Sequence, residues 1–256
     1  MILRPILFHI GSYPVYSYGV MLFLAFLAGI FVARYELNRR GLDGSAIYLI
    51  GAVAAIAGIV GARIFYVAGH WDVFSHDLGS IIDFNMRGLV YYGGLFLAIP
   101  CCLILVKRMK LPLGAVADAT ALALPLSIGI ARVGCFLNGC CGGKPSGLPW
   151  AVTFPGDSIS VHPTQLYELI LDLAAFAFLF YMRKRMRKDW NLFLLSLAAY
   201  GIIRFTVEFF RFHYDTSAGL FFQVVSLVLA ALALGFFFYR NRGVEESATV
   251  AGEANE

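Results

Sequence analysis

Residues 46–67, AIYLIGAVAAIAGIVGARIFYV, are apolar almost throughout and contain one charged side chain, Arg63. A helix needs roughly 20 mostly apolar residues to cross the hydrocarbon core of a bilayer. In that core every backbone polar group must be bonded within the protein, which a helix achieves. This stretch therefore predicts a membrane-spanning helix, and it decides the fold class of the chain.

Comparable apolar stretches continue on both sides of it, and about seven have the length of a membrane span. They cover residues 16–33, 46–67, 88–106, 113–131, 165–182, 191–210 and 220–239. The chain is 60% hydrophobic and 14% charged, unlike ordinary soluble domains. We expect an all-α membrane protein with a single polytopic domain over residues 1–243, embedded in the bilayer.

The basic residues fall into alternate connections between these stretches. One set of connections carries about 13 Lys and Arg and the other about 5, so the positive-inside rule places the N-terminus outside the cytoplasm and the C-terminus within it. The two longest connections, about 70–87 and 132–163, then lie on the extracytoplasmic side. Residues 244–256 are acidic and rich in small side chains, which predicts a disordered cytoplasmic tail.

Charge and cysteine content exclude two other classes of protein. The net charge of +4 is distributed in short clusters between apolar stretches and forms no basic face, so nucleic acid is not an expected partner. The cysteines lack the spacing of a disulfide framework or a zinc site, and we interpret them as small packing residues. No metal or organic cofactor is expected. The five cysteines are Cys101, Cys102, Cys135, Cys140 and Cys141.

Two arginines lie at informative positions: one next to a glycine-rich segment that could bind an anion, and one within an apolar stretch where a charge is costly. Arg132 precedes the glycine-rich segment 133–143, VGCFLNGCCGG, where it either extends to the membrane interface or binds an anionic headgroup through its planar fork. Arg204 lies within an apolar stretch, at a cost of several kcal/mol. Helical spacing places Glu208 on the same face as Arg204 and Arg211, so it can pair with both. The alternatives are a neutralised structural network and an arginine-lined cavity for an anionic lipid.

Residues at the start of the fifth apolar stretch have less certain partners. His162 precedes Pro163, which suits the first turn of a helix, so His162 is either a capping or interface residue or a proton carrier. Glu168 lies one to two turns further along and can pair with Arg132 or Arg204. The sequence leaves both choices open.

Taken together, these motifs resemble prolipoprotein diacylglyceryl transferases. The resemblance extends from about residue 16 to residue 240 on a frame of seven spans, and its specificity lies in the order of the fragments. The fragments are Tyr18-Gly19, Gly61-Ala62-Arg63, Tyr92-Gly93-Gly94-Leu95, residues 132–143, residues 162–168 (HPTQLYE) and residues 204–211 (RFTVEFFR).

The resemblance implies a transferase of the bacterial cytoplasmic (inner) membrane that performs the first step of lipoprotein maturation. Its substrates would be phosphatidylglycerol and a preprolipoprotein whose lipobox cysteine supplies the reacting sulfur. The thiol would attack the glyceryl carbon that bears the phosphate, forming a thioether and releasing glycerol 1-phosphate. None of the chain's own cysteines needs to react in such a mechanism.

The resemblance also implies roles for individual residues. Arg132 and Arg204 match the family's essential arginines and would hold the phosphate, since preorganised cations stabilise the charge on a departing phosphate. The other implied catalytic residues are Tyr18, Tyr92 and Glu208. The other implied substrate-binding residues are Arg211, Asn138, Gly143, Gly93, Gly94 and His162.

Two departures from the family pattern affect the base. Tyr92 stands where some members have a histidine, so histidine catalysis at that position is not available here. Cys135 and Cys140 stand where some relatives have an asparagine and an acidic residue. The sequence therefore does not identify the general base.

Two other functions compete with this one. A transporter or flippase for an anionic solute or lipid would place Arg63, Arg204 and Glu208 along a pathway, but it predicts internal repeats, and none is evident. A membrane thiol oxidoreductase would depend on Cys135, Cys140 and Cys141. Formation of a thioether lipopeptide from phosphatidylglycerol separates the transferase from both.

Overall fold

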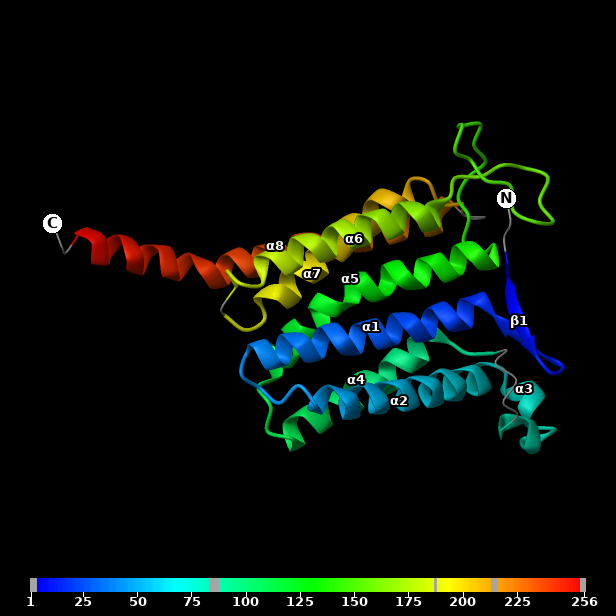
Figure 1. Ribbon diagram of the computed structural model, residues 1–256, viewed down its shortest axis with the longest axis horizontal. Helices are drawn as coiled ribbons and strands as arrows, with labels where there is room; N and C mark the ends of the chain where they lie inside the picture. The colour runs from blue at the N-terminus through cyan, green and yellow to red at the C-terminus, as the bar shows by residue number, and fades with distance from the viewer. Residues whose placement is uncertain (1–3, 83–87, 187, 213–215, 254–256) are drawn as a thin grey trace. The chain divides into compact units, whose positions relative to one another are not determined.

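The computed structural model describes residues 4–82, 88–186, 188–212 and 216–253 (Figure 1). Arg87 and Arg187, which enter the charge argument above, lie outside these residues. Within the described part of the chain, seven helices are long and apolar enough to cross a membrane, which confirms the predicted class. They are α1 (Ser17–Arg39), α2 (Ala46–Gly69), α4 (Tyr91–Arg108), α5 (Leu113–Asn138), α6 (Thr164–Met182), α7 (Asn191–Glu208) and α8 (Thr216–Glu253).

Smaller elements accompany the helices near the N-terminus and after α2. An antiparallel hairpin of β1 (Ile6–Ile10) and β2 (Tyr13–Tyr16), which the all-α prediction did not include, turns at Gly11 with a positive φ of 60°. A short helix α3 (Trp71–Phe74) and a 3-10 turn η1 (Leu78–Ile82) follow α2. The predicted tail, residues 244–256, stays a prediction; helix α8 as described continues to Glu253.

The described residues form two compact units, one from Arg34 to Val116 and the other from the residues before and after that segment. In the first unit α2 and α4 pack closely because glycines line their contact. A Cβ atom on Gly94 would lie 2.9 Å from the carbonyl oxygen of Gly58, and one on Gly93 would lie 2.6 Å from that of Gly61. Small residues permit this approach of two helix backbones.

Arg63, in the same unit, binds the backbone of the connection that follows α2. Its guanidinium donates to the carbonyl oxygens of Ile81 at 3.1 Å and Ser80 at 2.8 Å, and it lies over the ring of Phe74 at 5.3 Å. These bonds hold the 3-10 turn against the end of α2. Within this unit, Arg63 therefore has a structural role in positioning that turn.

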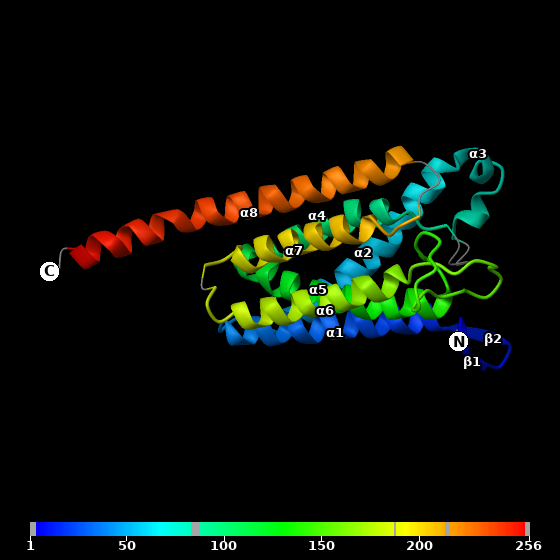
Figure 2. The same ribbon diagram turned by 90° about the horizontal axis from the view of Figure 1, so that it is seen from above.

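The second unit contains the first part of α1 with most of α5 and all of α6, α7 and α8 (Figure 2). Polar side chains join its helices at a few points. The Ser127 hydroxyl on α5 donates to the carbonyl oxygen of Ala25 on α1 at 2.9 Å, and the Asp118 carboxylate accepts from the backbone N–H of Phe193 at 2.8 Å. The second bond satisfies a donor at the start of α7 that has no partner within the helix.

Candidate active site

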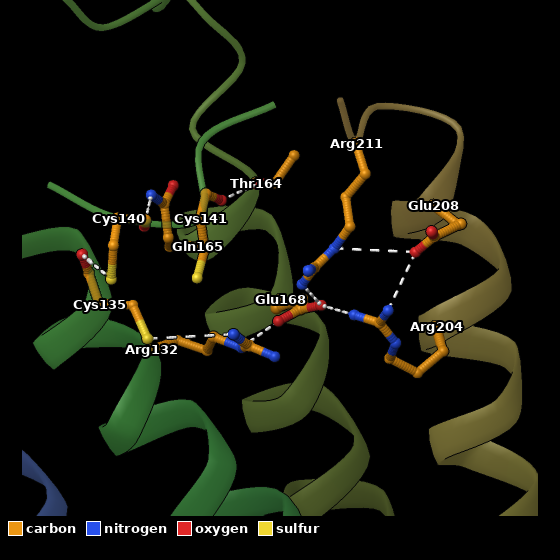
Figure 3. Close-up of polar contacts among 10 residues, drawn as sticks. All are labelled: Arg132, Cys135, Cys140, Cys141, Thr164, Gln165, Glu168, Arg204, Glu208 and Arg211. Carbon is orange, nitrogen blue, oxygen red and sulfur yellow. Dashed lines mark hydrogen bonds and ion pairs between the residues drawn. The ribbon is translucent and has the colours of Figure 1, made fainter. Parts of the chain in front are cut away.

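Three arginines converge on one buried carboxylate in this second unit (Figure 3). Glu168 on α6 forms ion pairs with Arg132 from α5, Arg204 from α7 at 2.6 Å, and Arg211 just beyond α7 at 2.8 Å. Its side chain is 2% exposed. Because α6 contributes the carboxylate and the cations come from α5, α7 and the residue just beyond α7, the arrangement exists only when α5, α6 and the end of α7 are packed together.

Glu208 supplies a second carboxylate to the same cluster. Its Oε2 atom lies 3.0 Å from Nη2 of Arg204 and 3.7 Å from Nε of Arg211. The pairing of Glu208 with an arginine on each side, predicted from helical spacing, is confirmed. The second distance is too long for a hydrogen bond, so the Nε donor of Arg211 keeps bonding capacity.

The charges of this cluster favour an anion. Three arginines and two glutamates leave one net positive charge when all five are ionised. Each guanidinium has five N–H donors, and the contacts with Glu168 and Glu208 described above use only part of them. A phosphate entering here would meet preorganised cations within protein of low dielectric, where they stabilise negative charge strongly.

Helix α5 ends immediately beside the cluster in a sharp turn. The N–H of Gly139 donates to the carbonyl of Phe136 at 3.1 Å and that of Cys140 to the carbonyl of Cys135 at 3.1 Å, which is the Schellman pattern. Gly139 supplies the positive φ, 72°, that this motif needs. The turn returns Cys140 to the last turn of α5, beside Cys135.

The next residue, Cys141, also has a positive φ, 66°. A non-glycine residue in this region costs about 1–3 kcal/mol and persists only when its surroundings hold it. Here the Thr164 hydroxyl donates to the carbonyl of Cys141 at 2.8 Å, and the Gln165 amide donates to the carbonyl of Cys140 at 2.6 Å. The start of α6 therefore fixes the backbone of both cysteines.

The turn brings three thiols together. The sulfur atoms of Cys135, Cys140 and Cys141 all lie within 4.8 Å of one another, and that of Cys135 lies 4.0 Å from Nη1 of Arg132. A hydrogen bond from the Cys135 thiol is the main cause that lowers the pKa of Cys141 to about 5; a bond with Cys140 and the guanidinium of Arg132 add to it. The sequence spacing did not predict this cluster.

The loop after the cysteines is joined to the end of α7 by main-chain bonds. Gly143 donates to the carbonyl of His162 at 2.9 Å, and Lys144 donates to that of Phe210 at 2.8 Å, one residue before Arg211. A Cβ atom on Gly143 would collide with the Phe210 carbonyl and lie 2.8 Å from Thr164 Cγ2. Gly143 therefore permits the approach that holds Arg211 in place.

His162 lies beside this loop in an aromatic cluster. Its Nδ1 atom is 3.1 Å from the hydroxyl of Tyr167, which also accepts from the indole of Trp150 at 2.9 Å. The His162 ring lies 5.2 Å from the ring of Phe210, centroid to centroid. These contacts give His162 a structural setting next to Arg211, and a substrate-binding role for it remains a prediction.

The other predicted site residues of this unit lie around the thiols. The Tyr18 phenol interacts electrostatically with Arg132 and with the three cysteines. The Cα atom of Tyr18 lies 3.3 Å from the position that a Cβ atom on Gly134 would take. The Asn138 side chain bonds the thiol of Cys140. Tyr18 and Asn138 therefore border the same group as Arg132.

Three predicted residues belong to the other unit and are described only there. Gly93 and Gly94 are buried at the contact of α4 with α2, which gives them a packing role within that unit. Tyr92 is the second residue of α4, next to Tyr91, with 62% of its surface exposed. Their predicted part in substrate binding or catalysis stays a prediction.

Several residues of the site are not predictable as such from the sequence. Glu168 is expected there to pair with Arg132 or Arg204, whereas in the structure it is the partner of three arginines. Thr164 and Gln165, within the segment 162–168, carry no predicted role of their own. The same holds for the buried Asp172, one turn beyond Glu168 on α6, whose Oδ2 atom has no hydrogen-bond partner among the described residues. The available signal was the pair of acidic residues four positions apart within an apolar stretch, since ionisable residues in membrane spans are usually functional.

Comparison with known proteins identifies the family. Residues 5–239 match the family model described as prolipoprotein diacylglyceryl transferase. A phosphatidylglycerol–prolipoprotein diacylglyceryl transferase of Dehalococcoides mccartyi is 34% identical over 251 residues, covering 95% of this chain and 96% of the relative. Proteins of the same name from Finegoldia magna, at 35% over 80% of this chain and 82% of the relative, and Methylobacillus flagellatus, at 32% over 81% and 83%, are also similar.

These matches cover all of the membrane-length helices except the last residues of α8, and they favour a transferase over a transporter. The ordered motifs, the seven apolar helices and the near full-length similarity agree with one another. The chain belongs to the prolipoprotein diacylglyceryl transferase family.

Proposed function

We propose that this protein transfers the diacylglyceryl group of phosphatidylglycerol to the thiol of the lipobox cysteine of a preprolipoprotein. The products are a thioether-linked lipoprotein precursor and glycerol 1-phosphate. The relatives carry the name of this activity, with phosphatidylglycerol and prolipoprotein as the substrates. The observation that carries the proposal is the convergence of Arg132, Arg204 and Arg211 on Glu168 in a multi-pass membrane protein.

The arginine cluster matches the electrostatic demand of this reaction. The phosphodiester of phosphatidylglycerol carries one negative charge, and a second develops on the phosphate as its bond to the glyceryl carbon breaks. Cations held in place before the reaction stabilise that added charge without reorganisation. Arg132 and Arg204 hold the phosphate, and Glu168 and Glu208 keep the guanidiniums oriented.

The remaining predicted residues complete the site. Arg211 binds the headgroup from the end of α7, and Gly143 fixes the loop that positions it. Tyr18 and Asn138 border the thiols next to Arg132, where the sulfur of the substrate must approach the phosphate-bearing carbon. From the family resemblance, we also assign a catalytic hydroxyl to Tyr92 and substrate-binding roles to Gly93, Gly94 and His162.

The same proposal includes the placement of the chain in the membrane. The N-terminus lies outside the cytoplasm, the C-terminus lies inside it, and the membrane is the bacterial inner membrane. Residues 1–243 form the membrane domain, 244–256 the cytoplasmic tail, and the segments 70–87 and 132–163 face outward. The excess of Lys and Arg in alternate connections supports this orientation.

Complementation tests the activity in a living cell. A strain depleted of its own transferase accumulates unmodified precursor of a reporter lipoprotein. Expression of this chain should restore the mass of the diacylglyceryl thioether on the reporter cysteine, and the Arg204→Ala variant at matched abundance should not. Unmodified reporter in cells that contain folded wild-type protein would refute the proposal.

Cysteine labelling tests the orientation. In a variant without native cysteines, a cysteine placed at position 147 should react with a membrane-impermeant maleimide in intact cells, and one at position 186 should react only after the cells are opened. The reverse pattern would refute the orientation and leave the activity unaffected.

A further inference from the structure

The three thiols next to Arg132 do not themselves react in the proposed transfer, because the reacting sulfur belongs to the substrate. Cys135 is buried, Cys140 partly buried and Cys141 exposed, and all three are free. Two features of the backbone bring them together: the Schellman turn at Gly139 and the left-handed conformation of Cys141. Among the described residues, these are the only His, Cys, Asp or Glu side chains grouped as metal ligands would be.

The spacing of the sulfurs suits a soft metal ion. Zinc binds thiolates at about 2.3 Å, so the sulfurs of a tetrahedral site lie about 3.8 Å apart. The three sulfurs here already lie within 4.8 Å of one another, and side-chain rotation closes the difference. The carbonyl groups of Cys140 and Cys141 are bonded to Gln165 and Thr164, so their backbone is fixed before any ion binds.

The surrounding charge also favours thiolate ligands. Three thiolates and one divalent cation carry a net charge of −1. Arg132 and Arg211 both interact electrostatically with Cys141, and the Arg132 guanidinium lies 4.0 Å from the sulfur of Cys135. Cations at this distance stabilise an anionic metal–thiolate group, so the arginines do not repel the bound ion as they would repel a bare one.

We propose that Cys135, Cys140 and Cys141 bind one Zn²⁺ ion and leave its fourth position open for the thiol of the lipobox cysteine. Soft thiolate ligands select such metals, and three protein ligands with an open position are typical of catalytic zinc. This inference rests on the proposed transferase function. It supplies what the sequence lacks, because neither a histidine at position 92 nor a carboxylate at position 140 is present to activate the substrate thiol.

The chemistry balances without a further reactant. On binding to the ion the substrate thiol loses its proton to water, since a thiol coordinated to zinc is deprotonated. A lone pair of the bound sulfur forms the new C–S bond at the glyceryl carbon. The electron pair of the breaking C–O bond leaves with glycerol 1-phosphate, whose added charge is held by the arginines next to the thiols.

Cobalt provides a direct probe of the site. Purified, reduced, full-length protein in detergent should bind one Co²⁺ per chain, with the near-ultraviolet thiolate-to-cobalt absorption and the visible bands of a tetrahedral ion, and Zn²⁺ should displace it. Cys135→Ser, Cys140→Ser and Cys141→Ser should each weaken Co²⁺ binding by more than about 100-fold, since even indirect partners of a metal account for 10–100-fold. The double variant Cys101→Ser/Cys102→Ser, which alters thiols of α4 outside the cluster, should bind like the wild type.

Binding of a substrate thiol at the open coordination position of the metal can be measured separately. A lipobox peptide with cysteine should increase the thiolate-to-cobalt absorption as a fourth sulfur binds, and the same peptide with serine should not. Cys141→His, which keeps a ligand, should retain Co²⁺ with a shifted spectrum, so that loss of binding in the serine variants is not mistaken for misfolding. Absence of Co²⁺ binding by the wild type, or equal binding by the three serine variants, would overturn the inference.

Failure of this inference and failure of the proposed function give different results. If metal-free protein binds no Co²⁺ but still forms thioether in the presence of a chelator, the zinc site is wrong and the transferase function stands. If the protein binds Co²⁺ and responds to the cysteine peptide but forms no thioether with phosphatidylglycerol, the transferase function is wrong and the metal site stands.

Discussion

Replacing Glu168 with Gln removes the negative charge on which three arginines converge, while nearly preserving the shape of the side chain. Glu168 pairs with Arg132, Arg204 and Arg211, and its side chain is 2% exposed, so water cannot replace the lost carboxylate. Removal of one partner from a buried ion pair costs about 3–5 kcal/mol, because the other charge stays buried and unpaired. We expect a loss of stability in this range.

Glu208→Gln is the matched control. Glu208 is equally buried, but it contacts two arginines, one of them at 3.7 Å, and Glu168 would still pair with both. For a chain of this size, about 1 kcal/mol corresponds to roughly 2–4 °C in melting temperature. The melting temperature of Glu168→Gln in detergent should therefore fall by roughly 10 °C, and that of Glu208→Gln by less than half as much.

Transfer activity should follow the same order when it is measured below both melting temperatures. The guanidiniums of Glu168→Gln repel one another without their shared anion, so the phosphate-binding geometry is lost. Thioether formation, followed by mass spectrometry, should fall at least about tenfold in Glu168→Gln, about 1.4 kcal/mol of barrier. Equal melting temperatures and equal activities for the two variants would refute the idea that Glu168 organises the site.

Three further substitutions test other parts of the site. Arg204→Ala should reduce transfer at least about 100-fold, because one preorganised donor contributes several kcal/mol. Arg204→Lys should restore little of the activity, because lysine lacks the planar fork of arginine. Full activity of the alanine variant would remove Arg204 from the mechanism. Gly143→Ala should lower the free energy of unfolding by about 1–3 kcal/mol, because the new Cβ atom would collide with the Phe210 carbonyl. The control Gly147→Ala, whose Cβ atom would meet nothing within 4 Å, should be neutral in the same thermal unfolding measurement. Equal melting temperatures of the two variants would contradict this packing. Tyr92→Phe should reduce kcat/KM through the loss of one hydrogen bond to the substrate, which contributes about 1 kcal/mol, and Tyr91→Phe should leave kcat/KM unchanged. Unchanged kinetics of Tyr92→Phe would leave that hydroxyl without a role.

Contacts within a single helix were predictable from the sequence. Apolar length alone predicted the seven long helices, because lipid leaves no other way to satisfy the backbone of a single segment. The spacing of Arg204 and Glu208 predicted their ion pair, because residues four apart lie on one helical face. Arg211 also pairs with Glu208 as predicted, although α7 ends at Glu208. Here the local geometry determines the contact.

Contacts between helices were not predictable in the same way. Glu168 had two possible partners in the sequence, and the meeting of α5, α6 and the end of α7 gave it three. The thiol cluster depends on a Schellman turn followed by a second left-handed residue, and Cys141 adopts that conformation because Thr164, distant in the sequence, bonds its carbonyl group. Such features follow from tertiary packing, and helical periodicity does not predict which helices pack together.

We propose that the protein transfers a diacylglyceryl group from phosphatidylglycerol to a peptide thiol at the arginine cluster. Incubation of the purified protein with phosphatidylglycerol and a lipobox peptide tests this activity, with both products measured by mass spectrometry. We predict one glycerol 1-phosphate released for each thioether lipopeptide formed, no product from a peptide with serine in place of cysteine, and neither product from the Arg204→Ala variant. Absence of the thioether from folded wild-type protein, or undiminished formation by Arg204→Ala, would contradict the claim.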